Sequence, residues 1–276
     1  MSKLILSVQD ISCVGQCSLT VALPVVSACG VECAILPSAV LSTHTAGKFR
    51  ECGFSVKDLS PEFPVINDYW KKAGVKFNAV CTGYLGSTDQ IDYVLNIADS
   101  CMKDGGLLII DPAMGDGGQL YPAFDMTYVN AMKKLCAKAD VVLPNITEAS
   151  FLTGIEYKEK YDEAYVKAIC DKLLEMGAKK VVLTGVSYDD ESTGVFIYSD
   201  KDQYYYRHKK ISQSYHGTGD IYSACFAGKL MAGKNEKEAA RIAADFVCKA
   251  IENTVGDDSH WYGVKFEALL GELANM

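Results

Sequence analysis

Short apolar runs rich in β-branched residues alternate with longer segments of helical period along the first two thirds of the chain. The runs that we expect to be strands are Leu4–Gln9, Cys33–Pro37, Ala79–Thr82, Leu107–Ile110, Val141–Leu143 and Lys180–Thr184. Most are nearly continuously hydrophobic, which is typical of strands covered on both faces in a parallel sheet. The helical segments between them include Gln90–Lys103, Asp125–Ala137 and Glu163–Met176. This repetition predicts a three-layer α/β/α, doubly wound fold with a mainly parallel sheet.

The pattern changes after Thr184. Gly194–Tyr198 and Gln203–His208 flank a polar stretch at 199–202 that suits a hairpin turn, so a small late hairpin is expected. Two helices then close the chain, and the second, Glu236–Glu252, places its apolar residues on one face. No repeat, low-complexity tract or linker interrupts the sequence. We therefore expect residues 1–276 to form a single domain.

Composition excludes several classes of protein. Apolar residues make up 49% of the chain and charged residues 22%, which allows a sizeable core. A net charge of −8 argues against nucleic acid or an anionic membrane as the main partner. No apolar run approaches the length of a membrane span, and the N-terminus lacks the pattern of a signal peptide.

The eleven cysteines are scattered and form no CxxC motif. Their number is odd, and they lie in apolar sequence where a reduced cysteine behaves as a small hydrophobe. Cys13 and Cys17, like Cys29 and Cys33, are four residues apart, a spacing that would place each pair on one helical face. We expect reduced cysteines in a cytoplasmic protein.

The segment most suggestive of chemistry is 216–220, His-Gly-Thr-Gly-Asp, which opens the predicted helix Ile221–Met231. Glycines before a helix let the backbone turn tightly and expose N–H groups, which together with the helix dipole form an anion site. A carboxylate at the same helix start can accept a proton from an alcohol that attacks a bound phosphorus atom. Taken alone, the segment is equally consistent with a turn and a helix cap made by Asp220.

Five segments together resemble the pyridoxal kinase branch of the ribokinase-like superfamily. They are Gly-Thr-Gly-Asp at 217–220, Ser-Thr-His-Thr at 42–45, Gly-Tyr-Leu-Gly at 83–86, Asp-Pro-Ala-Met-Gly-Asp at 111–116 and Pro-Asn-Ile-Thr-Glu at 144–148. Their order and approximate spacing match that family over most of the chain. The last four each follow a predicted strand, which would place them at the ligand-binding edge of an α/β sheet.

The resemblance implies an ATP-dependent kinase that phosphorylates the 5′-hydroxymethyl group of pyridoxal, pyridoxine or pyridoxamine. It implies that Asp220 is the catalytic base, with Gly217, Thr218 and Gly219 forming the anion site. It assigns Asp111, Asn145 and Glu148 to the bound ATP and its Mg²⁺, which as a hard cation suits carboxylates that act through water. It assigns Thr184 and Gly185 to the nucleotide phosphates or ribose. A monovalent cation such as K⁺ and a homodimer are also plausible from the resemblance.

For the acceptor, a small heteroaromatic alcohol, the resemblance nominates Asp10, His44, Thr45 and Tyr84. The tyrosine ring would pack against a flat heteroaromatic substrate. Many pyridoxal kinases carry serine where this chain has Asp10. An ionised aspartate accepts hydrogen bonds but cannot donate them, so the change favours a protonated ring or a cationic amine and leans towards pyridoxamine.

Two alternatives remain open at the level of the sequence. A hydroxymethylpyrimidine kinase shares the fold and the Gly-Thr-Gly-Asp segment, although the segments at 42–45 and 83–86 favour a B6 vitamer. The other alternative is a non-catalytic sensor that binds a B6 vitamer or a nucleotide. Such a protein would be expected to lose the base or the metal carboxylates, yet Asp220, Asn145 and Glu148 are all present.

Overall fold

A nine-stranded sheet runs through the computed structural model, which describes residues 3–45 and 47–276. In spatial order its strands are β11 (Gln203–Lys209), β10 (Ser192–Tyr198), β9 (Val181–Val186), β8 (Val141–Val142), β5 (Met102–Ile110), β4 (Phe77–Thr82), β1 (Leu4–Ser12), β2 (Glu32–Leu41) and β3 (Val56–Asp58). The six strands from β9 to β2 are parallel, whereas β3 at one edge and β10 and β11 at the other are antiparallel. A separate two-stranded hairpin consists of β6 (Gly115–Asp116) and β7 (Gln119–Leu120).

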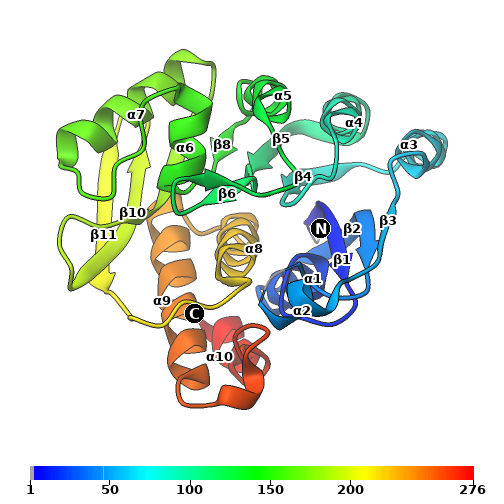
Figure 1. Ribbon diagram of the computed structural model, residues 1–276. Helices are drawn as coiled ribbons and strands as arrows, with labels where there is room; N and C mark the ends of the chain where they lie inside the picture. Colours follow the sequence, from blue (N-terminus) through cyan, green and yellow to red (C-terminus); the bar gives the residue numbers. More distant parts are fainter. Residues whose placement is uncertain (1–2, 46) are drawn as a thin grey trace.

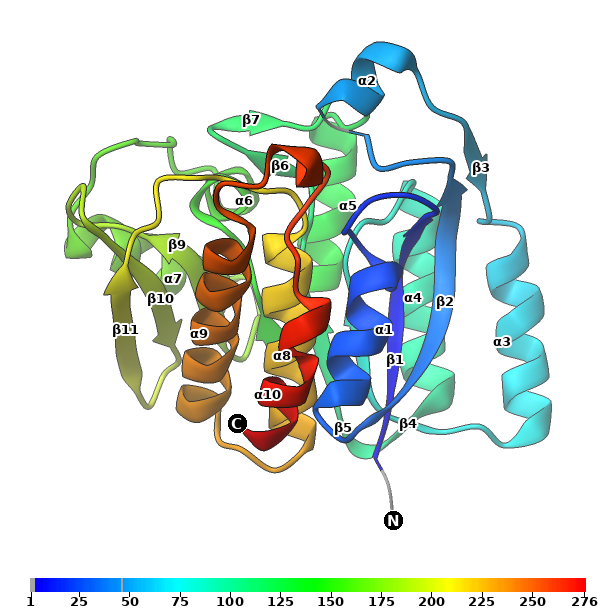
Figure 2. The same ribbon diagram turned by 90° about the horizontal axis from the view of Figure 1, so that it is seen from below.

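Helices cover both faces of this sheet (Figures 1 and 2). The α-helices are α1 (Leu19–Ala28), α2 (Lys48–Cys52), α3 (Glu62–Ala73), α4 (Thr88–Cys101), α5 (Met126–Cys136), α6 (Ile146–Thr153), α7 (Glu163–Glu175), α8 (Thr218–Met231), α9 (Glu236–Thr254) and α10 (Leu270–Asn275). Two short 3₁₀ turns, Asp258–His260 and Glu267–Leu269, lie between α9 and α10. Helices α1, α8, α9 and α10 contribute to one apolar core, and α3 to α7 contribute to the other.

Alternating residues of β1, an interior strand of the sheet, contribute to both cores. Ile5 of β1 packs into the core with α1 and α8, whereas the adjacent Leu6 packs into the core with α3 to α7, and neither is exposed. Burial on both faces explains why the parallel strands are hydrophobic without alternation. The mainly parallel, doubly wound fold predicted from the sequence is confirmed.

The late hairpin is also confirmed, but it extends the main sheet, because β10 pairs with β9 as well as with β11. Several predicted boundaries were wrong. Helix α4 ends at Cys101, so that Met102 and Lys103 begin β5, and α8 begins at Thr218 and not at Ile221. The helical placement of the cysteine pairs was wrong too. Cys13 and Cys17 lie in the loop before α1, and Cys29 and Cys33 lie after α1 and in β2.

The winding of the sheet fixes where a ligand can bind. The chain passes from β1 to β2 on one side and later from β4 to β5, β8 and β9 on the other, so the direction reverses between β1 and β4. In open α/β sheets, ligands bind at such a point, beyond the carboxyl ends of the strands. Within the described residues, no helix combines the length and the apolar character needed to cross a bilayer.

Candidate active site

The first turn of α8 carries the Gly-Thr-Gly-Asp segment. Gly217 caps the helix in the left-handed conformation, with φ of 80°, and a Cβ there would lie 1.7 Å from the carbonyl oxygen of Gln16. Only glycine can therefore make this turn against the loop after β1. A Cβ on Gly219 would meet no atom within 4 Å, so the space in front of the helix start is open. The first N–H groups of α8 face that space without intrahelical partners, as an anion site requires.

Asp220 is the third residue of α8 and is partly exposed. Its Oδ2 accepts a hydrogen bond from the backbone N–H of Ser18 at 2.9 Å. Loss of solvent around the carboxyl group raises its pKa to about 7, and the negative charges of Asp111 and Asp10 add to the shift, while the Ser18 N–H opposes it. A carboxylate with a pKa near neutrality can take up a proton at physiological pH.

Asp10 lies close to Asp220 because it is near the carboxyl end of β1, at the switch point of the sheet. Its carboxylate is buried and accepts hydrogen bonds from the hydroxyls of Ser12 (3.0 Å) and Ser18 (2.5 Å). Burial raises the pKa of Asp10 despite these two bonds. One carboxylate oxygen of Asp10 is thus bound by the last residue of β1, and the other by the residue that precedes α1. The charge of Asp10 also helps to raise the pKa of Tyr84, after burial, so these two candidate acceptor residues are neighbours.

Asp111 and Glu148 form a buried pair of carboxylates beyond β5 and β8. Glu148 accepts hydrogen bonds from the N–H groups of Met114 (3.1 Å) and Asn145 (2.9 Å), and Asp111 accepts one from Ser223 of α8. Burial raises the pKa of Glu148, and the charge of Asp111 raises it further. No ion pair within the described residues neutralises either group.

Asn145 serves mainly to hold Glu148. Its Oδ1 accepts from the N–H of Glu148 at 2.9 Å, which completes a capping box at the start of α6, and its Nδ2 donates to the carbonyl of Gly115 at 2.9 Å. Both ends of the Asn145 amide are thus engaged within the protein, and its side chain fixes the position of Glu148. Among residues 3–45 and 47–276, no cluster of three or more histidine, cysteine, aspartate or glutamate side chains could bind a metal by itself.

Thr184 and Gly185 end the parallel part of β9, beside Asn145. Thr184 pairs with Asn145 through an isolated parallel bridge, and its hydroxyl donates to the carbonyl of Pro144 at 3.3 Å. Gly185 has a φ of 71°, and a Cβ there would meet open space. These two residues therefore line the same edge of the sheet as Asp111 and Glu148, further from β1.

An aromatic cluster lies near the start of α8. The buried ring of His44 lies 4.9 Å from Phe49 and 5.0 Å from His216, and Phe49 lies 4.6 Å from Trp261 of the loop after α9. Burial, with a smaller contribution from His216, lowers the pKa of His44 to about 4. Burial also lowers the pKa of His216, so both rings are neutral at pH 7. Thr45 is exposed at the rim of this cluster.

Four residues at the site were not singled out from the sequence. Tyr121, after β7, is close enough to the carboxylates to feel their charge. Its pKa is raised by burial first and then by the charges of Glu148, Asp116 and Asp111. The others are Ser18, Ser223 and Trp261, which join the site only through long-range contacts. Ser18 does precede a helix, as a capping residue would, but its side chain makes no cap.

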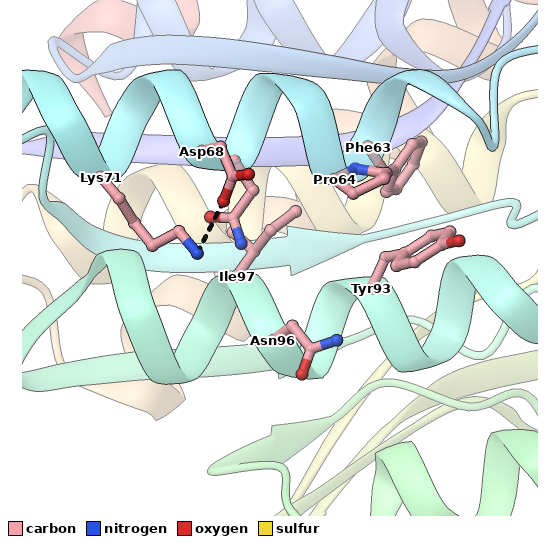
Figure 3. A pocket seen from close by; sticks show the side chains of 8 residues that line it. Phe63, Pro64, Asp68, Lys71, Tyr93, Asn96 and Ile97 are labelled. Carbon is pink, nitrogen blue, oxygen red and sulfur yellow. Dashed lines mark ion pairs between the residues drawn. The ribbon is translucent and has the colours of Figure 1, made fainter.

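A second hollow lies away from this site, between α3 and α4 (Figure 3). Its volume is about 270 Å³, and its lining includes Phe63, Tyr93 and the ion pair of Asp68 with Lys71 at 2.9 Å. None of the residues at the strand ends contributes to it. The chemistry suggested by the sequence is therefore concentrated at the switch point and not in this groove.

Comparisons with known proteins point to one family. A family model for phosphomethylpyrimidine kinase matches residues 38–263. A structure from Bacteroides thetaiotaomicron with pyridoxal is 35% identical, covers 100% of this chain and 96% of that one, and has a TM-score of 0.93. The pyridoxal kinase of Lactobacillus plantarum is 32% identical over 99% of this chain and 97% of that one, with a TM-score of 0.90. The hydroxymethylpyrimidine/phosphomethylpyrimidine kinase of Haemophilus influenzae is 28% identical over 238 residues, which are 81% of this chain and 84% of that one.

Proposed function

The chain belongs to the phosphomethylpyrimidine kinase family, and on that premise we propose that it phosphorylates the 5′-hydroxymethyl group of a B6 vitamer: pyridoxal, pyridoxine or pyridoxamine. Membership of this family makes the chain an ATP-dependent phosphotransferase. The observation that carries the proposal is the position of Asp220, a partly exposed carboxylate at an open helix start, within the field of Asp111 and Asp10.

Asp220 is the base in this proposal. The acceptor hydroxyl attacks the γ-phosphorus of ATP, the bond from that phosphorus to the bridging oxygen of ADP breaks, and the hydroxyl proton passes to Asp220. In a loose transition state the alcohol proton becomes acidic only as the new bond forms, so a carboxylate is a sufficient base. The N–H groups of Thr218 and Gly219 would meet the negative charge on the transferred phosphoryl oxygens.

The carboxylates of Asp111 and Glu148 fit a magnesium ion that is bound through water. Both carboxyl groups are buried, and neither has an ion-pair partner among the described residues. The negative charge of one makes ionisation of the other less favourable, so a bound divalent cation would relieve their repulsion. The backbone donors on Glu148 fix its orientation, as is common for groups that act on a metal from a distance. When bound, Mg²⁺ would supply charge neutralisation for the triphosphate. Asn145 would act by holding Glu148, and Thr184 and Gly185 by contacting the nucleotide.

The acceptor would lie between Tyr84 and the aromatic cluster. Tyr84 offers a ring face for a flat heterocycle. His44 is neutral at pH 7 and buried, so it suits hydrogen bonding to a ring substituent better than binding of an anion. Thr45 would contribute a hydroxyl at the rim, and Asp10 a negative charge beside Tyr84. This combination favours an uncharged or cationic heteroaromatic alcohol.

A panel of acceptors tests the proposal. ADP formation is measured with fixed Mg·ATP and with pyridoxal, pyridoxine, pyridoxamine or hydroxymethylpyrimidine, for the wild type and for Asp220→Asn. We expect acceptor-dependent ADP formation with at least one B6 vitamer and its loss by a factor of at least about 10² in Asp220→Asn, as removal of a general base implies. Full activity in that variant would reject Asp220 as the base.

A second candidate function is hydroxymethylpyrimidine kinase, which the Haemophilus relative supports by its name. The same panel separates the two, because a higher kcat/KM for hydroxymethylpyrimidine than for every vitamer would favour it. A non-catalytic sensor is the third candidate. Binding of pyridoxal without acceptor-dependent ADP formation would identify it, whereas the retained Asp220, Asp111 and Glu148 argue against it.

Four further expectations belong to this proposal. A single kinase domain over 1–276 is supported by one sheet that takes strands from Leu4 to Lys209 and by one apolar core that α1 shares with the C-terminal helices α8, α9 and α10. A cytoplasmic location is supported by the eleven cysteines, all of them free. A homodimer and a monovalent cation such as K⁺ rest on the family resemblance alone.

A further inference from the structure

The loop between β1 and α1 is clamped across the start of α8. The carbonyl of Gln16 lies where a side chain on Gly217 would be, and the Gln16 N–H donates to the carbonyl of Tyr262 at 3.2 Å. On the other side, a Cβ on Gly263 would lie 2.4 Å from Cβ of Gln16. The β1–α1 loop is thus packed between α8 and the loop that follows α9. Its last residue, Ser18, contacts Asp220.

Ser18 adopts a backbone conformation that normally requires glycine. Its φ is 55° and its ψ is −132°, and it is the one non-glycine residue with positive φ among those that the structure describes. For a residue with a Cβ, such a conformation is strained and persists only where contacts enforce it. The carbonyl of Ser18 accepts the first helical bonds of α1, from the N–H groups of Val21 (3.0 Å) and Ala22 (2.8 Å). Towards the site, its Oγ donates to Asp10 at 2.5 Å and its N–H donates to Asp220 at 2.9 Å.

We propose that Ser18 is a positioning residue for the base, an inference that rests on the proposed function. Its side chain is anchored on Asp10, and this anchor holds the strained backbone so that the N–H points at Oδ2 of Asp220. One carboxylate oxygen is thereby fixed and the other is left for the acceptor hydroxyl. Asp10 is part of this device, because it supplies the buried acceptor that offsets the backbone strain at Ser18.

The proposed role of Ser18 predicts different effects of two substitutions at this position. In Ser18→Ala the anchor is lost while the Cβ remains, so the residue relaxes to negative φ and the N–H turns away from Asp220. In Ser18→Gly the anchor is also lost, but glycine occupies positive φ without strain, so the N–H keeps its direction. If the Ser18 hydroxyl instead touched the acceptor directly, the two variants would be impaired equally.

The experiment measures kcat and both KM values with Mg·ATP and the best B6 vitamer for the wild type, Ser18→Ala and Ser18→Gly. We expect kcat to fall about tenfold or more in Ser18→Ala, the loss that about 1.4 kcal/mol in the barrier produces. We expect Ser18→Gly to stay within about threefold of the wild type, and KM for ATP to be unchanged in both. Ser27→Ala, on the exposed side of α1, serves as the control, because the Ser27 side chain makes no hydrogen bond with the described residues.

Thermal unfolding shows whether each variant is folded. Adding Ser18→Ala to the Asp220→Asn variant then distinguishes loss of positioning of Asp220 from a general loss of activity. In Asp220→Asn, the added Ser18→Ala substitution should lower the residual kcat by less than twofold, because the base that Ser18 orients is gone. Equal kcat values for Ser18→Ala and the wild type would overturn the inference, as would equal losses in the alanine and glycine variants. Absence of acceptor-dependent ADP formation in the wild type would instead reject the proposed function.

Discussion

Ser223 donates a hydrogen bond from its Oγ to Oδ2 of Asp111, although 112 residues separate the two in the sequence. Ser223 lies three residues after Asp220 on α8, on the same face of the helix. One helix therefore presents the proposed base and, one turn later, orients a carboxylate that we assign to the magnesium and ATP site. The two halves of the proposed site are coupled through the first two turns of α8.

Removal of the Ser223 hydroxyl is expected to weaken ATP use selectively. In Ser223→Ala, Asp111 loses the hydrogen bond that favours its charged form, so a buried carboxylate becomes harder to ionise and binds magnesium less well. We expect KM for Mg·ATP to rise about three- to tenfold, corresponding to a lost bond of roughly 1 kcal/mol, with KM for the acceptor unchanged. Steady-state kinetics with each substrate varied in turn check this, with Ser27→Ala as the control. A rise in the acceptor KM alone would contradict the role given to Ser223.

Alanine at Gly219 is expected to stabilise the fold and to slow catalysis. Gly219 is the second residue of α8, where a Cβ would meet open space, and alanine is favoured over glycine in a helix by about 0.5–1 kcal/mol. The new methyl group would occupy the space in which the transferred phosphoryl group approaches the helix N–H groups. We expect a midpoint of thermal unfolding at or above that of the wild type, together with a kcat lowered by at least about tenfold. Full activity of Gly219→Ala would show that the phosphoryl group lies elsewhere.

Gly217→Ala is the matched contrast and is expected to damage the fold itself. Its Cβ would lie 1.7 Å from the carbonyl oxygen of Gln16, at a φ of 80°. We expect a loss of stability on the order of 2–4 kcal/mol, since the turn and the clamped loop must both move. Urea denaturation of the two glycine variants measures the difference. Equal stability of the two variants would contradict the packing of the β1–α1 loop on α8.

The sequence predicted the sheet and the residues at its edge, because both follow from local patterns. Apolar runs marked the parallel strands, and the polar residues after them had to lie at the carboxyl ends of those strands. This is why Asp111, Glu148 and Thr184 appear on the same edge of the sheet. Boundaries were less accurate where two patterns meet: Met102 and Lys103 continue a helical period but belong to β5, where Met102 pairs with Phe77 of β4.

The contacts that complete the site could not be predicted in the same way. Ser18 meets Asp220 across 202 residues of sequence, and Phe49 meets Trp261 only because two distant loops converge. No local pattern carries such a contact, since it depends on how the layers pack. The strain at Ser18 is equally invisible in a sequence, because serine before an apolar helix normally indicates a cap. The magnesium role of Asn145 stays a prediction, and the bond from its Nδ2 to the carbonyl of Gly115, 30 residues away, is another contact that no local pattern carries.

Exchange of Asp10 for serine is expected to change the preference among vitamers. The carboxylate of Asp10 lies beside Tyr84 and favours a cationic acceptor. We therefore expect Asp10→Ser to lower kcat/KM for pyridoxamine relative to pyridoxal by about threefold or more, the effect of a modest charge interaction. Ratios of kcat/KM for the three vitamers measure this and are insensitive to a general loss of activity. An unchanged ratio would remove the basis for a vitamer preference set by Asp10.

The buried carboxylates should make the ligand-free protein less stable as the pH rises. Burial raises the pKa of Asp220 to about 7, and the pKa values of Asp111 and Glu148 are raised as well. Between about pH 4, where aspartate titrates in an unfolded chain, and pH 7, the folded protein holds a proton on Asp220 that the unfolded chain has released. The contribution of Asp220 to the free energy of unfolding therefore falls as the pH rises through this window and levels off above it, while Glu148, with its pKa raised to about 8, extends the fall to about pH 8. The share of Asp220 is on the order of 1–2 kcal/mol, reduced from the full shift because the group is partly exposed.

Urea denaturation at pH 5, 6, 7 and 8 measures this dependence, with Asp220→Asn as the matched variant. Asparagine still accepts the bond from the Ser18 N–H but carries no charge, so its advantage over the wild type should grow from pH 5 to pH 8. Magnesium provides the second arm, because it binds the ionised forms of Asp111 and Glu148. Added Mg²⁺ should raise the free energy of unfolding of the wild type more at pH 8 than at pH 5, and this gain should be absent in Glu148→Gln. A constant gap between wild type and Asp220→Asn at all four pH values would show that Asp220 does not hold a proton in the folded state.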